Sequence, residues 1–273
     1  MGEISDFKIG QNTIQKATQR PARLTGLFWG SAGTGKTTLA CTAPGRKLLV
    51  NFDPDGQTSV AGFEDLDVLD LSGPDISVVE LFKGQDPLKL GSIIQNYDTL
   101  IIDSLTNDAF KTLMRGVAMS KGASIERPDP QAYQVRNSLI VQLVKNTLAM
   151  TSKFGTHVIF IAHEDAPVMN DEGVVMHITL SLGGKLPEQT ALDFSEVWCI
   201  QDMGVGRDRR VIFRPARNRK PMKTRMFDTS SEAEFSWQFD PDTGKGMTVA
   251  GWYEEWKANG FRKIAVPKAK VKK

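Results

Sequence analysis

Eight consecutive residues carry the strongest chemical signal in the chain: Gly30-Ser31-Ala32-Gly33-Thr34-Gly35-Lys36-Thr37. They fit the pattern of a glycine, four residues of any type and then Gly-Lys-Thr, which is typical of loops that bind phosphate. Glycine lets such a loop turn tightly, so that successive backbone N–H groups face phosphate oxygens. We therefore predict that residues from Gly30 through Thr38 bind the phosphates of ATP. Lys36 should reach the β- and γ-phosphates, and Thr37 should be a ligand of Mg²⁺.

A carboxylate that follows a buried strand is the second requirement of such a site, because it holds magnesium opposite the loop hydroxyl. Asp103 ends the apolar run that starts at Leu100 and is predicted to fill this role. Asp103 also precedes Ser104 at the expected start of a helix, where an aspartate suits the N-cap. Asp98 lies at the start of the same predicted strand, 97–103, and should lie at the opposite edge of the sheet, which makes it the weaker choice.

Hydrolysis further requires a group that activates or orients water. Asp53 ends the preceding predicted strand and is our candidate base, with Asp55 as a close competitor. Both residues also suit turn formation in Asp53-Pro54-Asp55-Gly56. This segment matches the Asp-x-x-Gly of GTPases, but no later segment resembles the Asn-Lys-x-Asp that reads guanine, so ATP is favoured. His163 follows a later strand, where a neutral imidazole is placed to contact the γ-phosphate and report its loss.

These residues need a sheet that brings the ends of several strands together. Apolar runs alternate with helical segments at a spacing that indicates βαβ units. The runs expected to be strands are 24–29, 47–52, 68–71, 97–103 and 157–162, followed by later strands over 194–201 and 210–214. Helices are expected over 36–41, 75–96, from Ser104 for about four turns, over 131–153 and over 248–258, with mobile loops at 116–130 and 164–184 and a hairpin within 174–180. We predict an α/β fold with a mostly parallel central sheet flanked by helices and with late antiparallel strands.

Length and composition are those of one folded domain with short appendages: 273 residues, 40% hydrophobic and 24% charged. We expect an N-terminal arm over 1–22, an ATPase domain over 23–258 and a basic tail over 259–273. No apolar stretch approaches the roughly 18 residues of a membrane span, so no membrane partner is expected. With only two cysteines, we expect a cytoplasmic protein with reduced thiols.

The net charge of +2 conceals two basic segments. Residues 207–225 hold nine Lys or Arg and one acid, and residues 262–273 hold six Lys or Arg and no acid. The rest of the chain is therefore acidic, and the asymmetry favours a polyanionic partner. A solvated face and a frayed lysine tail are the simpler alternatives.

Several of these motifs together resemble the RecA recombinases. Ile101-Ile102-Asp103-Ser104-Leu105 resembles their magnesium-binding strand, in which Ser follows the Asp. Ile159-Phe160-Ile161-Ala162-His163 resembles their next strand, and Gly183-Gly184 followed by 194–200 resembles the segment after their second DNA-binding loop. The resemblance runs over roughly residues 24–215. Among these proteins the chain is most similar to the short phage ATPases that keep little beyond the RecA core and act in single-strand annealing.

This resemblance implies a RecA-like P-loop NTPase fold and a DNA-stimulated ATPase that binds single-stranded DNA and promotes annealing or strand exchange. It also implies phage recombination or replication in the host cytoplasm, a ring or filament of identical subunits, and a single-strand DNA-binding protein as a partner. Asp53 matches the position of the family's catalytic Glu, and His163 matches its switch Gln. The two DNA-contacting loops map to 115–130 and 164–182, but the second is acidic here, which suits phosphate poorly.

The basic segment offers another DNA surface, with Phe213 and Phe227 nearby for base stacking. The candidate cations for DNA, or for the γ-phosphate of a neighbouring subunit, are Lys185, Arg214, Arg217, Arg219 and Lys220. A charged surface hairpin is the simpler interpretation. Two other functions stay open: a P-loop switch ATPase that acts on a protein partner such as a loader or assembly factor, and a small-molecule kinase. A kinase should carry a lid with paired arginines over an acceptor pocket.

Overall fold

The computed structural model describes residues 23–54, 59–73, 90–120, 124, 126–204, 209–213 and 218–268, together with the backbone of a short strand pair near the N-terminus. That pair consists of β1 (Lys8–Ile9) and β2 (Asn12–Thr13). Most of the predicted N-terminal arm, and most of the helical segment predicted over 75–96, lie outside the described residues; α3 (Leu90–Ile94) is the part of the latter that is described.

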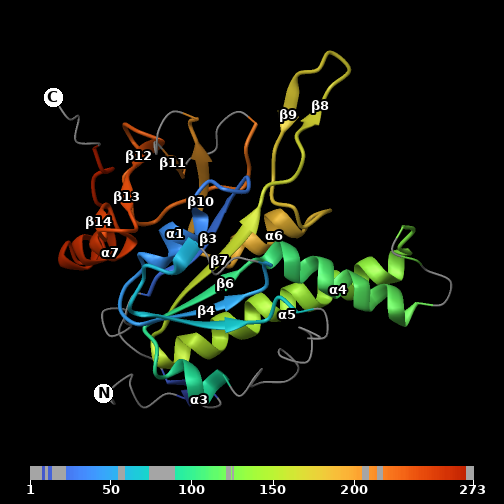
Figure 1. Cartoon of the computed structure of the whole chain (residues 1–273), viewed down its shortest axis with the longest axis horizontal. Helices are drawn as coiled ribbons and strands as arrows, with labels where there is room; N and C mark the ends of the chain where they lie inside the picture. The colour runs from blue at the N-terminus through green and yellow to red at the C-terminus, as the bar shows by residue number, and fades with distance from the viewer. Residues whose placement is uncertain are drawn as a thin grey trace.

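An eight-stranded sheet forms the centre of the molecule, in the order β12-β11-β10-β3-β7-β6-β4-β5 (Figure 1). The strands from β10 to β5 in this order are parallel, and β11 and β12 add antiparallel at one edge. The bounds in chain order are β3 (Thr25–Gly30), β4 (Lys47–Asn51), β5 (Leu66–Asp70), β6 (Thr99–Asp103), β7 (His157–His163), β10 (Glu196–Asp202), β11 (Arg209–Ile212) and β12 (Glu234–Trp237). The predicted fold class, including the late antiparallel strands, is confirmed.

Helices cover both faces of the sheet, because successive side chains of its buried strands point to opposite sides. On β3, Leu27 and Trp29 belong to one buried cluster, whereas Phe28 belongs to the other. The first cluster is closed by the long helices α4 (Leu105–Met119) and α5 (Pro130–Phe154) and the short α6 (Leu186–Leu192). The second is closed by α1 (Lys36–Cys41) and α7 (Val249–Ala258) and is rich in aromatic rings. In that cluster Phe28 stacks on Trp198 at 4.8 Å between ring centroids.

Helix α7 is joined directly to the end of α1. The hydroxyl of Thr42, the C-cap of α1, accepts a hydrogen bond from the backbone N–H of Val249 at 2.9 Å. The carbonyl of Thr42 accepts another from the N–H of Ala250, also at 2.9 Å. The helix that follows the phosphate loop is thus fixed at its far end by the last helix described.

A hairpin projects from the carboxyl edge of the sheet (Figure 1), made of β8 (Val168–Met169) and β9 (Val175–His177). The sequence predicted a hairpin in this loop, and the structure confirms one that starts earlier than expected. A second short hairpin, β13 (Phe239–Asp240) with β14 (Lys245–Gly246), lies before α7.

The prediction of a loop over 116–130 is wrong for residues 116–119, because α4 continues to Met119. Glycine and nearby polar residues suggested a break, but Gly116 is buried against α5: a Cβ placed on it would lie 2.6 Å from the carbonyl oxygen of Ala132. The glycine therefore permits close helix packing. Helix α6 and strand β12 were not predicted at all, since each is only a few residues long.

The segment after α7 packs on the domain, although the sequence placed it in the basic tail. Ile264 is 4% exposed and Val266 is 7% exposed. Ile264 forms an isolated β-bridge with Phe227. These two apolar side chains extend the aromatic cluster beyond the expected end of the domain. Among the residues that the structure describes, no helix has the length and apolar content to cross a membrane.

Candidate nucleotide site

The loop from Gly30 to Lys36 connects β3 to α1 at the carboxyl edge of the parallel strands, and its backbone can be formed only with glycine at several positions. Gly33 and Gly35 have φ of 76° and 85°, in the left-handed region. A Cβ on Gly30 would collide with the carbonyl oxygen of Ile200 on the neighbouring strand β10. Close contact with the sheet and a tight turn thus explain the glycines.

The Lys36 side chain lies along this loop and is only 5% exposed. Its Nζ donates to the carbonyl oxygen of Ser31 at 2.6 Å. Burial lowers the pKa of Lys36, while the nearby carboxylates of Asp103, Asp53 and Glu164 oppose that effect. The ammonium is therefore held between the loop and a set of acids, at the end of the loop where a triphosphate carries its β- and γ-phosphates.

Thr37 and Asp103 meet across the junction of α1 and β6. The Thr37 hydroxyl donates to Oδ2 of Asp103 at 2.6 Å, and Asp103 is 2% exposed. Burial raises the pKa of Asp103 to about 6, against the hydrogen bond from Thr37 and the charge of Lys36. Mg²⁺ prefers hard oxygen ligands and usually takes one or two from the protein, with the rest from phosphate and water. This hydroxyl and carboxylate fit such an ion.

Asp53 lies just past the end of β4, and three donors surround its carboxylate. Oδ1 accepts from Ser104 Oγ at 2.9 Å and from the side-chain amide of Asn107, and Oδ2 lies 3.3 Å from Nε2 of His163. Burial alone would raise the pKa of Asp53, but the bonds to His163, Ser104 and Asn107 outweigh it, and the pKa is lowered. Asp53 is therefore ionised near neutral pH, as a base must be. Its competitor Asp55 lies outside the described residues.

His163 is the last residue of β7 and pairs with Gly30 at the start of the phosphate loop. Its backbone N–H donates to Thr106 Oγ1 at 2.9 Å, which fixes the strand end against α4. The imidazole is 28% exposed and contacts Asp53. The structure thus brings Lys36, Thr37, Asp53, Asp103 and His163 to one edge of the sheet. Their roles in binding and hydrolysis stay predictions.

The predicted basic residues differ in their exposure: two are exposed, one is partly buried and two lie outside the described residues. Lys185 is exposed at the N-cap of α6, and Lys220 is also exposed. Arg219 turns inward toward Glu164, whose Oε2 lies 3.9 Å from Nε of Arg219. Arg214 and Arg217 lie outside the described residues.

Several residues at this edge were missed by the sequence analysis. Asn107 contacts Asp53 from the first turn of α4, four residues after Asp103, a position that the helical spacing could have indicated. Arg209 lies against the phosphate loop, with its Cζ 2.6 Å from where a Cβ on Gly35 would stand. No sequence signal separates Arg209 from the other cations of the basic segment.

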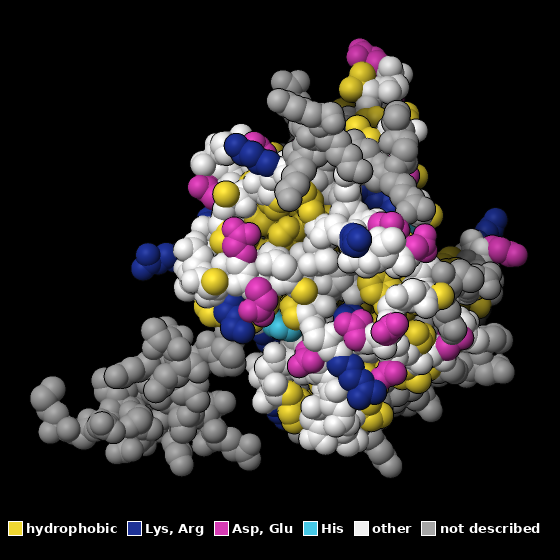
Figure 2. Space-filling model, turned by 60° about the vertical axis from the view of Figure 1, so that its left-hand side comes forward, with side chains coloured by type: hydrophobic (Ala, Val, Ile, Leu, Met, Phe, Trp, Pro, Cys, Tyr) yellow, Lys and Arg dark blue, Asp and Glu magenta, His cyan; other side chains and the backbone are white. Residues whose placement is uncertain are grey.

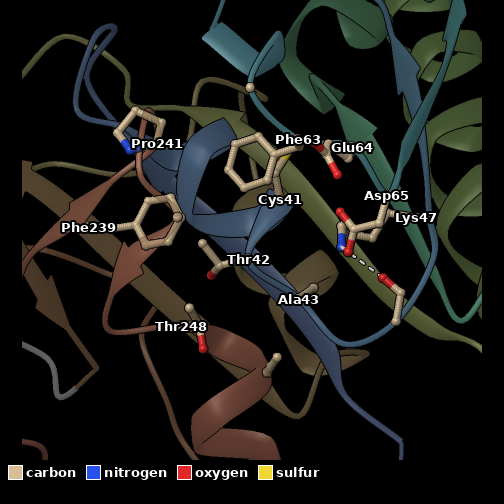
Figure 3. A pocket seen from close by; sticks show the side chains of 14 residues that line it. Cys41, Thr42, Ala43, Lys47, Phe63, Glu64, Asp65, Phe239, Pro241 and Thr248 are labelled. Carbon is tan, nitrogen blue, oxygen red and sulfur yellow. Dashed lines mark hydrogen bonds and ion pairs between the residues drawn. The ribbon is translucent and has the colours of Figure 1, made fainter.

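A cavity of about 300 Å³ lies away from this site, at the far end of α1 (Figure 3). The nearly parallel rings of Phe63 and Phe239 form part of its wall, with centroids 5.9 Å apart. Lys47, at the start of β4, forms an ion pair with Asp65 at the rim. Since Lys47 begins its strand and the phosphate loop follows the end of one, this cavity belongs to the opposite edge of the sheet. It is not part of the candidate nucleotide site.

Comparison with known proteins adds a family and two similar folds. A family model for the AAA domain matches residues 22–232, which include every described residue of the phosphate site. The structure of a KaiC-like protein from the hyperthermophilic archaeon Pyrococcus horikoshii OT3 is 16% identical, over 82% of this chain and 88% of that one, with a TM-score of 0.44. That of the RadB recombinase is 10% identical, over 80% of this chain and 88% of that one, with a TM-score of 0.48. No curated protein matches the chain.

Proposed function

The chain belongs to the AAA domain family, and from that premise we propose that it is an ATPase that binds single-stranded DNA and promotes its annealing or strand exchange. The observation that carries the ATPase part is the 2.6 Å hydrogen bond between Thr37 and Asp103 beside the buried Lys36. A loop hydroxyl and a strand-end carboxylate are the groups with which P-loop enzymes hold Mg²⁺, and their proximity here supports the proposal. The resemblance to the phage annealing ATPases supports the DNA part.

In the proposed reaction, a nucleotide binds to the N–H groups of the phosphate loop, and Lys36 moves from Ser31 to the phosphates. Thr37 and Asp103 would hold Mg²⁺, which would supply positive charge against the triphosphate. Asp53 accepts a proton from the attacking water, and its bonds from Ser104 and Asn107 fix the direction in which its carboxylate points. His163, next to Asp53, responds to the presence of the γ-phosphate.

A basic and aromatic group on α5, beside the Gly183 backbone, supports DNA binding. Tyr133 is 40% exposed, and the guanidinium of Arg136 lies 5.0 Å from the centre of its ring. Arg136 also lies against the Gly183 backbone, with its Nη2 3.1 Å from where a Cβ on that glycine would stand. Lys185, two residues after Gly183, is exposed. An exposed ring beside cations is the arrangement on which single-stranded bases stack.

The test of the proposal is the rate of ATP hydrolysis with and without single-stranded DNA, with oligomer size measured by light scattering in the same samples. We expect DNA to raise the rate and to accompany assembly into a ring or filament. Tyr133→Ala should lower DNA affinity about 10-fold, since one stacked base is worth about 1–3 kcal/mol. Tyr97→Phe is the control, because Tyr97 lies at the opposite edge and bonds to Asp67. A rate indifferent to DNA contradicts the DNA part and leaves the ATPase part standing.

The projecting hairpin favours a second candidate, a switch ATPase that acts on a protein partner. Four apolar side chains around it are about half exposed: Val168, Met169, Val174 and Met176. Figure 2 shows acidic side chains at the tip of this projection with apolar ones below them. Such a surface repels DNA phosphates and suits a protein.

The two candidates differ in what the hairpin variants do. Replacing Met169 and Met176 by Ser should leave DNA-stimulated hydrolysis unchanged if DNA is the ligand. The protein partner is favoured by a different pair of results. DNA then does not stimulate hydrolysis by the unmodified chain, whereas a cell extract does, and the Met169 and Met176 variant no longer responds to the extract.

A further inference from the structure

The strongest unassigned feature of the molecule is a chain of polar contacts that leads from the phosphate loop to the base of the hairpin. Ser31, in the loop, donates its hydroxyl to Oε1 of Glu164. The other oxygen of Glu164 lies 3.9 Å from Nε of Arg219, with the two side chains only 18% and 22% exposed. An ion pair this well shielded is not an ordinary surface contact.

The guanidinium of Arg219 contacts Gln201 more closely than it contacts Glu164. With its amide oriented so that the oxygen faces the guanidinium, the Gln201 oxygen lies 2.9, 3.1 and 2.8 Å from Nε, Nη1 and Nη2 of Arg219. The separation of 3.9 Å from Glu164 is too long for a hydrogen bond. Arg219 is therefore positioned by Gln201, and its interaction with Glu164 is electrostatic.

The same arginine lies within electrostatic reach of the phosphate site of its own subunit. Glu164 contacts both Arg219 and Ser31 of the phosphate loop, so only one side chain separates the guanidinium from the loop. Lys36 rests on the carbonyl of Ser31, and Ser31 also contacts Glu164, so the end of the loop that meets the γ-phosphate is the end nearest this pair.

The backbone at Arg219 is joined to the hairpin. The N–H of Ile178 donates to the carbonyl of Asn218 at 2.6 Å, and the N–H of Lys220 donates to the carbonyl of Ile178 at 3.1 Å. Ile178 directly follows β9. Isolated β-bridges pair Ile178 with Arg219 and Glu164 with Leu180. Both partners of the ion pair are therefore anchored at the hairpin base.

We propose that Arg219 contacts the γ-phosphate of the nucleotide bound to its own subunit and, through Glu164 and Ile178, passes the presence of that phosphate to the β8–β9 hairpin. A γ-phosphate next to Glu164 would add negative charge beside an acid that Arg219 already pairs with, so this cation would serve both groups. The inference rests on the proposed ATP binding. It replaces the expectation that Arg219 acts on DNA or on a neighbouring subunit.

The first test compares the dissociation constants for ATP and ADP in Arg219→Ala, by titration calorimetry at protein concentrations where the chain is monomeric. Loss of a hydrogen bond to a charged group should weaken ATP binding by about 10- to 100-fold. ADP lacks the γ-phosphate, so its affinity should change less than about 2-fold. Arg219→Lys should restore part of the preference for ATP. Arg225→Ala, an exposed residue of the same basic segment, should keep the ratio of the unmodified chain.

An unchanged ratio of ATP to ADP affinity in Arg219→Ala overturns the inference, and ATP binding by the unmodified chain would still stand. Equal weakening of both nucleotides also overturns it, since that is the result of a general structural defect. Failure of the unmodified chain to bind ATP would instead remove the proposed function and the inference together.

The second test separates action within a subunit from action between subunits. Arg219→Ala and Lys36→Ala chains are mixed, and hydrolysis is measured in the mixture. If Arg219 serves its own site, no mixed assembly contains a complete site, so activity stays at the level of the separate variants. Recovery of activity overturns the inference. Hydrogen exchange in Val168–His177 should differ between the ATP and ADP states of the unmodified chain, and the difference should vanish in Arg219→Ala.

Discussion

Replacing Asp53 by Asn removes one negative charge from the nucleotide site and leaves the shape of the side chain unchanged. Asn retains an Oδ1 that can accept the bonds from Ser104 and Asn107. The interaction that is lost is the charge contact with His163, at 3.3 Å between side chains that are 20% and 28% exposed. A partly exposed pair of this kind contributes at most about 1 kcal/mol. We therefore expect Tm to change by no more than about 2–4 °C.

Turnover should respond much more strongly than stability. A positioned general base contributes about 100- to 10,000-fold to a rate, so Asp53→Asn should slow hydrolysis by that factor. The Kd for ATP should change less than about 3-fold, because Lys36, Thr37 and the loop backbone remain. Asp53→Glu, which carries the acid found at this position in the RecA recombinases, should retain hydrolysis.

The assay is release of inorganic phosphate at saturating ATP, together with the Kd from titration of a fluorescent ATP analogue. Asp67→Asn serves as the matched control. Asp67 is a carboxylate that is about half exposed and forms an ion pair with Arg46. It lies near the start of β5, at the edge of the sheet opposite the site. Unchanged turnover in Asp53→Asn would refute the role of Asp53 as base. A loss of ATP affinity greater than 10-fold would show that Asp53 binds the nucleotide instead.

Three further results are expected. Lys36→Ala should abolish nucleotide binding, measured by calorimetry, and retained ATP affinity would contradict the phosphate-site assignment. Lys185→Glu combined with Lys220→Glu should weaken DNA binding and flatten its salt dependence by a slope of about 2, measured by fluorescence anisotropy; an unchanged slope would exclude these exposed cations. Asp108 has both carboxylate oxygens unpartnered and buried, and burial raises its pKa to about 8. Because the folded chain then binds this proton more tightly than the unfolded chain, the contribution of Asp108 to stability is fully present below the unfolded pKa of about 4 and is lost as pH rises through about 8. Asp108→Asn should remove a loss on the order of 2–3 kcal/mol between pH 6 and 9, measured by urea unfolding.

The strands and the phosphate loop could be predicted from the sequence because their signals are local. The run that ends at Asp103 is apolar throughout, as a strand covered on both faces must be. The glycines around Lys36 have a fixed spacing that chain geometry requires. The helix bounds at Lys36–Cys41 follow from the same motif and from Pro44-Gly45 shortly after it.

The residues that could not be predicted depend on contacts between distant segments. Arg219 is one of several cations in a short stretch, and only its bridge to Ile178 turns it toward the phosphate loop. Gly116 suggested a loop until its packing against Ala132 was visible. Ile264 lies in a segment whose lysines and arginines suggested a solvated tail. In each case a pattern of side chains has two local interpretations, and tertiary packing selects one.

The attachment of α7 to α1 also determines when the nucleotide site can be completed during synthesis. The bond from Val249 to Thr42 joins residues 207 positions apart. While the ribosome is still translating the middle of the chain, α1 has its phosphate loop but lacks the helix that holds its other end. A six-residue helix is too short to be stable alone. Until α7 has left the exit tunnel, α1 depends on its contacts with β3, β6 and β7, so the nucleotide site should reach its full stability only when the whole domain can fold.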